Sequence, residues 1–215
     1  MTRRVLGIDG IDGSGKSTFT LRLVDEVRRR GGAPTVIHVD DFRRPVDWSR
    51  AERTEADLYY DDYYDFPLLE RCLEAYLGGV AEAEVPLFDA TAGRLAGTTV
   101  LDLRGDLAVV EGVFPLRCAT VRGDALVYLR ATPELARRRI LERDQRRGRA
   151  LADVEHRIDC RYFPGQRRYH AKFDPERLAR VVIDNEHPAA RRFIKREDDK
   201  LPPLVAAALV EIVGG

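Results

Sequence analysis

Long apolar runs are missing from this chain of 215 residues. The longest, from Leu201 to Val213, is interrupted by two prolines and Glu211 and is shorter than the roughly 20 apolar residues of a membrane-spanning helix. No apolar leader with a small-residue cleavage site follows Met1. We therefore expect no membrane partner, a cytoplasmic location and a packed C-terminal helix over residues 201–213.

Cysteine is scarce, and neither sign of charge is in excess. The three cysteines, at positions 72, 118 and 160, are odd in number and widely spaced, which fits neither a disulfide framework nor a zinc site. Thirty-six basic residues balance 36 acidic residues, whereas binding to nucleic acid rests on a basic excess. We expect reduced thiols and no nucleic-acid partner.

The sequence does contain short apolar segments that alternate with helical patterns. Strands are predicted at 5–8, 35–39, 107–110, 125–129 and 180–183, and helices at 17–30, 66–77, 133–142 and 152–171. The last helix is expected to be interrupted near Pro164 and Gly165. Strands this apolar are typical of a parallel sheet covered on both faces. We predict a single α/β domain over 1–215, in which the charged segment 186–200 is a surface connection.

A glycine-rich loop separates the first predicted strand from the first predicted helix. Residues 10–17 read GIDGSGKS and match the phosphate-loop (Walker A) motif G-x-x-x-x-G-K-[ST] at every specified position. In such a loop, backbone N–H groups surround a phosphate, the lysine reaches the β- and γ-phosphates, and the hydroxyl binds magnesium. We predict a P-loop NTPase fold with ATP and Mg²⁺ as cofactors. The predicted nucleotide contacts are Gly10, Asp12, Gly13, Ser14, Gly15, Lys16, Ser17 and Thr18.

Carboxylates stand at the ends of two predicted strands, at the edge where open α/β sheets bind ligands. Asp40 and Asp41 end the strand 35–39, and Glu111 ends the strand 107–110. Transfer of a phosphoryl group to a hydroxyl needs a residue that orients the acceptor and takes its proton, and we choose Asp40 over Asp41. Ser17, Asp40 and Glu111 are the predicted magnesium ligands. Acids that only cap a turn or end a strand are the alternative.

Seven arginines crowd residues 137–149, within an otherwise neutral chain. Arginine clamps phosphate through paired hydrogen bonds, so these residues predict a mobile lid over ATP, around 138–150, in which Arg143 contacts the nucleotide. A solvated helix face with i,i+4 ion pairs is the alternative. The guanine-reading motif N-K-x-D is not present in the sequence. A kinase of small molecules is favoured over a regulatory or switch protein, because a kinase needs the base supplied by Asp40.

In their order, these motifs resemble the uridine kinase and phosphoribulokinase group of P-loop kinases over roughly residues 5–185. The matching segments are GIDGSGKST, VDDF, YYDDYYDF, PLFDA, VVEGVF, RRILERDQRRGR and VVIDN. The resemblance implies a five-stranded parallel sheet with a small helical lid, and transfer of the γ-phosphate to a primary hydroxyl. It also implies Asp40 as base, Arg139 and Arg147 as catalytic residues facing the phosphates, and Asp61 on the acceptor. Asp57, Asp62 and Asp65 are alternatives to Asp61.

The acceptor side departs from this family at residues 86–94, which read PLFDATAGR. Uridine kinases resembling this chain have a tyrosine and a following histidine that contact the pyrimidine, whereas here Phe88 replaces the tyrosine and no histidine follows. Phe88 is expected to stack on a flat ring and Arg94 to contact a base or an anion, with nearby tyrosines as alternatives. We predict a nucleoside-like small molecule, similar to uridine or cytidine, as the acceptor. Other ribosides, phosphosugars and pantothenate-like metabolites remain open, as does assembly into a homo-oligomer.

Overall fold

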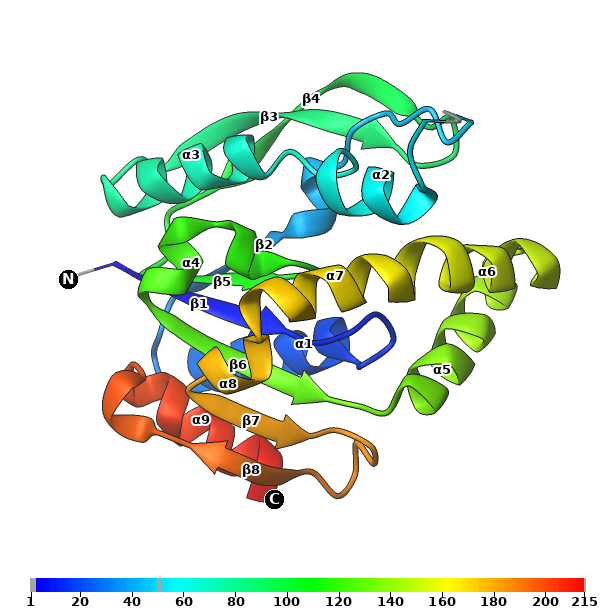
Figure 1. The fold of residues 1–215 in the computed structure, drawn as a ribbon. Helices are drawn as coiled ribbons and strands as arrows, with labels where there is room; N and C mark the ends of the chain where they lie inside the picture. The colour runs from blue at the N-terminus through cyan, green and yellow to red at the C-terminus, as the bar shows by residue number, and fades with distance from the viewer. Residues whose placement is uncertain (1–2, 50–51, 215) are drawn as a thin grey trace.

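A six-stranded sheet forms the centre of the molecule in the computed structural model, which describes residues 3–49 and 52–214 (Figure 1). The strands run in the order β2-β5-β1-β6-β7-β8, and the first five are parallel. They are β1 Arg4–Asp9, β2 Pro34–His38, β5 Leu107–Glu111, β6 Ala125–Arg130, β7 Val181–Asp184 and β8 Arg192–Arg196. The five parallel strands confirm the predicted sheet.

Strand β8 was not predicted. It pairs antiparallel with β7, so that Phe193 lies opposite Ile183 and packs on the core beside it. Its other residues are charged or half-exposed, because it is an edge strand. The interpretation of residues 186–200 as a plain surface connection is therefore wrong for this strand.

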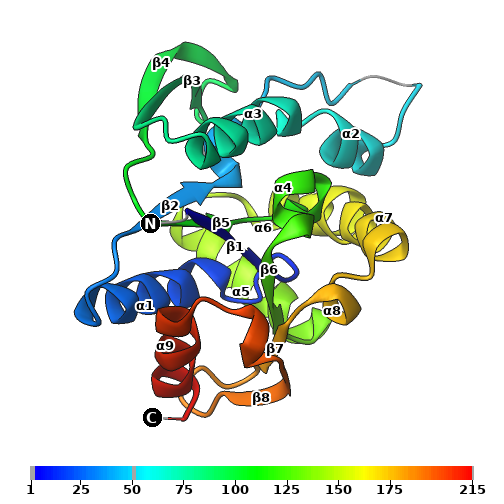
Figure 2. The ribbon, with the colours of Figure 1, turned by 90° about the vertical axis from the view of Figure 1, so that its left-hand side faces the viewer.

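Helices cover both faces of the sheet. Figure 2 shows α1 Lys16–Arg29 and α9 Pro203–Gly214 on one face, and α3 Phe66–Leu77, α4 Ala119–Gly123 and α7 Phe163–Phe173 on the other. Neighbouring strand residues alternate between these layers: Leu6 packs with Phe19 of α1, whereas Val5 packs in the second core with Leu69 of α3. Burial on both faces explains the continuous apolar runs of the strands.

A long helical arm leaves the sheet after β6. It consists of α5 Pro133–Arg146, α6 Leu151–Arg157, the π-helical segment η3 Ile158–Tyr162, and α7, followed by the short α8 Pro175–Leu178. The expected interruption near Pro164 takes the form of η3, because the wider π turn directly before the proline accommodates its missing N–H. The arm from α6 to α7 is otherwise continuous.

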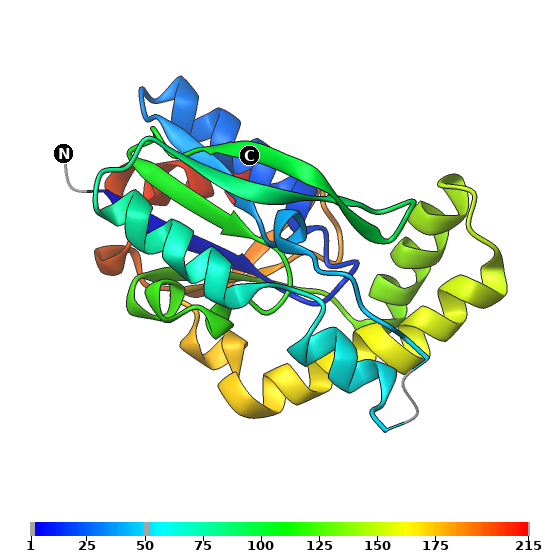
Figure 3. The same ribbon diagram turned by 90° about the horizontal axis from the view of Figure 1, so that it is seen from above.

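A β-hairpin that we did not predict lies beyond α3. It pairs β3 Glu82–Asp89 with β4 Arg94–Asp102, and β3 packs on the 3-10 turn η1 Val39–Phe42. Figure 3 shows the tip of the hairpin reaching toward α5 and α6, with the short helix α2 Glu55–Asp61 beside α7. Across residues 3–49 and 52–214, none of the helices has both the length and the apolar composition needed to span a membrane.

Candidate active site

The phosphate loop joins β1 to α1 and is packed tightly against α5 and the residue after β7. Gly13 and Gly15 have positive φ angles of 78° and 94°. A Cβ atom on Gly13 would lie 2.4 Å from the carbonyl oxygen of Ala136 in α5, and one on Gly15 would lie 2.7 Å from Nδ2 of Asn185. Lys16 curls over the loop and donates from Nζ to the carbonyl oxygens of Gly10 at 2.7 Å and Ile11 at 3.0 Å. The loop has the geometry that a phosphate cradle requires.

Three side chains from much later in the sequence hold the phosphate loop in place through hydrogen bonds. Asn185, directly after β7, donates from Nδ2 to the carbonyl oxygen of Ser14 at 2.6 Å, and Arg191 donates from Nε to Asn185 Oδ1 at 2.7 Å. Arg139 of α5 donates to the carbonyl oxygens of Asn185 and Glu186, both at 3.0 Å. Arg139 therefore lies at the loop, where it was predicted, but is already bound to backbone carbonyls.

A hydroxyl and a carboxylate meet where the magnesium ion was predicted. Ser17 Oγ lies 2.9 Å from Glu111 Oε1, and His38 Nδ1 lies 2.8 Å from Glu111 Oε2. Burial favours the neutral acid, but the bonds from His38 and Ser17 and the charge of Lys16 outweigh it, so the pKa of Glu111 is lowered. The contact with Glu111 raises the pKa of His38. Reasoning from sequence missed His38, although it ends β2 at the same sheet edge.

These groups fit magnesium. Mg²⁺ binds nucleotides through one or two protein oxygens together with phosphate oxygens and water. The Ser17 hydroxyl and the ionised Glu111 carboxylate supply such a pair. No group of three or more acidic, histidine or cysteine side chains that could hold a metal occurs in the described part of the chain. A site completed by ATP phosphates suits this arrangement.

Two adjoining cavities open at the carboxyl ends of the parallel strands. The nucleotide cavity, of about 480 Å³, is lined by the phosphate loop, Glu111, Arg139, Asn185 and Arg191. The acceptor cavity, of about 540 Å³, is lined by side chains of η1, α2, α5, α6, η3 and the tip of the hairpin. Four residues line both cavities: Asp12, Asp40, Arg143 and Arg147. The two cavities therefore meet at two carboxylates and two guanidinium groups.

Asp40 is the more accessible of the two acids at this junction. Its exposed carboxylate pairs with Arg43 and accepts a hydrogen bond from the Tyr64 hydroxyl at 3.3 Å. Asp12 is half-buried and accepts from Tyr59 Oη at 2.9 Å and Gln166 Nε2 at 2.6 Å, and burial raises its pKa. Asp41 lines neither cavity. The geometry thus favours Asp40 over its neighbour, as predicted.

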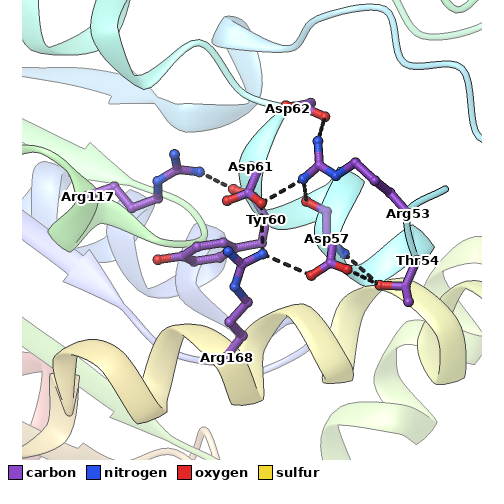
Figure 4. Close-up of polar contacts among 8 residues, drawn as sticks. All are labelled: Arg53, Thr54, Asp57, Tyr60, Asp61, Asp62, Arg117 and Arg168. Carbon is purple, nitrogen blue, oxygen red and sulfur yellow. Dashed lines mark hydrogen bonds and ion pairs between the residues drawn. The ribbon is translucent and has the colours of Figure 1, made fainter.

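The structure does not bring Asp61 to the acceptor cavity. Figure 4 shows its carboxylate between two guanidinium groups, with Arg53 at 2.6 Å and Arg168 at 2.8 Å. Asp57 also pairs with Arg168, at 3.0 Å, and Asp62 pairs with Arg53. Asp65 caps α3 instead. Tyrosines take the expected place of these acids, since Tyr59, Tyr63 and Tyr64 line the cavity.

The two residues predicted from the segment 86–94 differ in whether they line the acceptor cavity. Phe88 lines the acceptor cavity, with its ring centroid 6.3 Å from that of Tyr63. Arg94 starts β4, is exposed and lines neither cavity, although the adjacent residues 90–93 line the acceptor cavity. Arg143 and Arg147 reach both cavities from the end of α5, as a lid over phosphates would.

Comparison with known proteins identifies the family of this chain. The profile of the Phosphoribulokinase / Uridine kinase family matches residues 5–171. The chain belongs to this family. Among its relatives, uridine kinases of Deinococcus deserti and Lactobacillus johnsonii are 30% and 27% identical to it; each alignment spans 70% of this chain, and 73% and 72% of the respective relative. A solved structure from Bacillus stearothermophilus, described as a possible uridine kinase, has a TM-score of 0.66 at 25% identity, covering 85% of this chain and 89% of that one.

This member of the family is a small-molecule kinase, a phosphotransferase whose acceptor group is an alcohol. The matched region of the kinase contains the phosphate loop, Asp40, Glu111 and the arginines of α5. Asn185 and Arg191, which brace the loop, lie beyond it.

Proposed function

We propose that this kinase uses magnesium and ATP and moves the γ-phosphate to a hydroxyl of a small molecule, most simply the 5′-hydroxyl of a uridine- or cytidine-like nucleoside. One observation carries the proposal: Asp40, an exposed carboxylate that pairs with Arg43 and accepts from Tyr64, lines both the nucleotide cavity and the acceptor cavity. An acid in this position can reach an acceptor hydroxyl that faces the γ-phosphate.

Each group that lines the two cavities has a separate role in the proposed reaction. The acceptor oxygen attacks the γ-phosphorus, the bond from that phosphorus to the ADP oxygen breaks, and the hydroxyl proton passes to Asp40. Lys16 and the amides of the loop hold the β- and γ-phosphates, and Arg143 and Arg147 neutralise charge on the transferring group. Ser17 and Glu111 would hold magnesium, which when bound neutralises charge on the phosphate oxygens.

The names of the relatives support a pyrimidine nucleoside as acceptor, since they are uridine kinases. A second candidate is another small metabolite with a hydroxyl group, such as a different riboside, a phosphosugar or a pantothenate-like compound. Phe88 favours it, because a phenylalanine in the cavity wall offers no hydrogen bond by which a pyrimidine could be selected.

The test is a coupled ADP-release assay over nucleosides and small metabolites with magnesium ATP. We expect Lys16→Ala to abolish transfer. Asp40→Asn should lower kcat by roughly 100-fold or more while leaving ATP affinity within about twofold, because general base catalysis contributes about 10²- to 10⁴-fold. Asp41→Asn is the matched control, since Asp41 is adjacent and lines neither cavity. Near-normal turnover of Asp40→Asn would show that Asp40 is not the general base. Tight nucleotide binding without phosphorylation of any acceptor would favour a regulatory NTPase.

A further inference from the structure

The acceptor cavity is strongly basic, although the chain as a whole is neutral. Among the residues described, six arginines line it, against the two acids Asp12 and Asp40. Guanidinium groups that face one cavity repel one another, and a neutral nucleoside offers no charge to offset that repulsion. The arginines are Arg43, Arg143, Arg147, Arg149, Arg157 and Arg161.

Four of these six have carboxylate partners within the protein. The pairs are Arg43 with Asp40, Arg143 with Asp144 at 2.7 Å, Arg149 with Asp144 at 2.6 Å, and Arg161 with Glu55. For Arg147 and Arg157, no carboxylate of residues 3–49 and 52–214 lies within ion-pair distance. Arg147 also lines the nucleotide cavity, where ATP phosphates would pair with it. Arg157 lines the acceptor cavity and not the nucleotide cavity.

Arg157 and Arg161 both line this cavity, but only Arg161 is held by an ion pair. They are four residues apart on the helix that runs through α6 and η3, a spacing at which like charges destabilise a helix. The Arg161 side chain is only 14% exposed, and its guanidinium carbon lies 3.9 Å from the ring centroid of Trp48. Burial raises the pKa of Tyr162, and the adjacent positive charge and hydrogen bond of Arg157 oppose that rise. Because Glu55 already pairs with Arg161, an oxyanion in the cavity would supply the partner that Arg157 does not find among the described carboxylates.

We propose that the acceptor of this kinase carries an oxyanion group, a phosphate monoester or a carboxylate, which Arg157 binds while the acceptor hydroxyl faces Asp40. The inference rests on the proposed transfer to a hydroxyl, but it favours the second candidate acceptor, a small metabolite, over a neutral nucleoside and specifies that this metabolite is charged. Guanidinium groups suit either oxyanion because their paired N–H donors match two oxygens of one group. Uridine and cytidine, which are neutral, are then poor acceptors.

A series of acceptors that differ in charge tests the proposal. Each pentose is compared with its 5-phosphate and with the corresponding sugar acid, next to uridine and cytidine, in the ADP-release assay. We expect kcat/KM to be on the order of 10- to 100-fold higher for a charged member than for its neutral parent, as one charge-assisted contact supplies. The phosphate and carboxylate arms show which oxyanion the site prefers. Preference for uridine or cytidine over every charged compound would overturn the inference and leave the proposed function intact.

Substitutions assign the effect to the site. Arg157→Gln should raise KM for the charged acceptor on the order of 10- to 100-fold, with KM for ATP within about twofold. Arg157→Lys should restore part of the loss, since the charge remains. Arg167→Gln is the control, because Arg167 is exposed on α7 and lines neither cavity. An Arg157→Gln enzyme with unchanged KM for a charged acceptor would contradict the assignment.

A binding measurement tests the anion site independently of phosphoryl transfer. With magnesium and a non-hydrolysable ATP analogue filling the nucleotide cavity, titration calorimetry should detect inorganic phosphate bound by the wild type and weakened by Arg157→Gln. If phosphate binds in this way but no compound is phosphorylated, the proposed function fails and the anion site stands. If phosphate does not bind and no charged acceptor is used, the anion site fails.

Discussion

Asp9 is a buried carboxylate at the end of β1, directly before the phosphate loop. It is 1% exposed and accepts hydrogen bonds from the Gly10 N–H and the Tyr169 hydroxyl, both at 2.7 Å. Burial raises its pKa to about 6, although these two bonds and the charge of Lys16 oppose the rise. The folded protein therefore holds this proton more tightly than the unfolded chain, in which an aspartate has a pKa of about 3.9.

Asp9→Asn makes this difference measurable. A rise of about two pKa units corresponds to about 3 kcal/mol, which is the stability that the wild type loses at Asp9 as pH rises from below 4 to above 6. Asparagine can still accept from the Gly10 N–H, but the Tyr169 hydroxyl loses its acceptor, at a cost of about 1 kcal/mol. We expect the variant to be about 1 kcal/mol less stable than wild type near pH 4 and about 2 kcal/mol more stable near pH 7.5.

The assay is urea unfolding of both proteins across this pH range. The difference between them isolates Asp9, because the other titrating groups cancel. Asp124→Asn is a control of opposite sign: burial would raise the pKa of Asp124, but the hydrogen bond and charge of Arg4 outweigh it and lower the pKa. Its loss should therefore cost most at neutral pH and least below pH 4. A stability difference between Asp9→Asn and wild type that is independent of pH, or that moves against the variant as pH rises, would show that the pKa of Asp9 is not raised in the folded protein.

Two predictions concern the nucleotide side. Glu111→Gln should raise the magnesium concentration needed for half-maximal activity by roughly tenfold or more, measured as ADP release against magnesium at fixed ATP, since it removes an ionised oxygen ligand; an unchanged magnesium dependence would exclude Glu111 from the metal. Arg147→Ala should lower kcat on the order of 10- to 100-fold and change ATP affinity less, because Arg147 lines both cavities and in the proposed function neutralises charge on the transferring phosphate. Arg146→Ala is its control, because Arg146 is adjacent and lines neither main cavity. Equal kinetics of the two variants would show that Arg147 has no role in phosphoryl transfer.

The core and the nucleotide half of the site could be predicted from the sequence because their signals are local. Inner parallel strands are buried on both faces and therefore contain continuous apolar runs, as β5 does from Leu107 to Val110. The phosphate loop is a contiguous motif, and Asp40 and Glu111 follow strands directly. The hairpin β3–β4 was not predictable in this way, since β4 is exposed almost throughout and has no apolar face to alternate.

The acceptor half depends on contacts between distant segments, which a sequence does not display. The family resemblance implied Asp61, but helical phase decides which side chains face the cavity. Asp57 and Asp61, four residues apart in α2, turn together toward Arg168, whereas Tyr59, two residues from each, faces the cavity. Arg157, at the end of α6, and Arg161, within η3, line the same cavity from a helix that is distant from α2 in the sequence.

The wall shared by the two cavities has a consequence for inhibition. Because Asp12, Asp40, Arg143 and Arg147 belong to both linings, the two cavities adjoin at these side chains. A single molecule that joins an adenine nucleotide to an acceptor through a short linker could occupy both halves at once. Its second half would bind at the effective concentration set by the linker, in the millimolar range for a short flexible one, so its affinity would exceed that of either part alone.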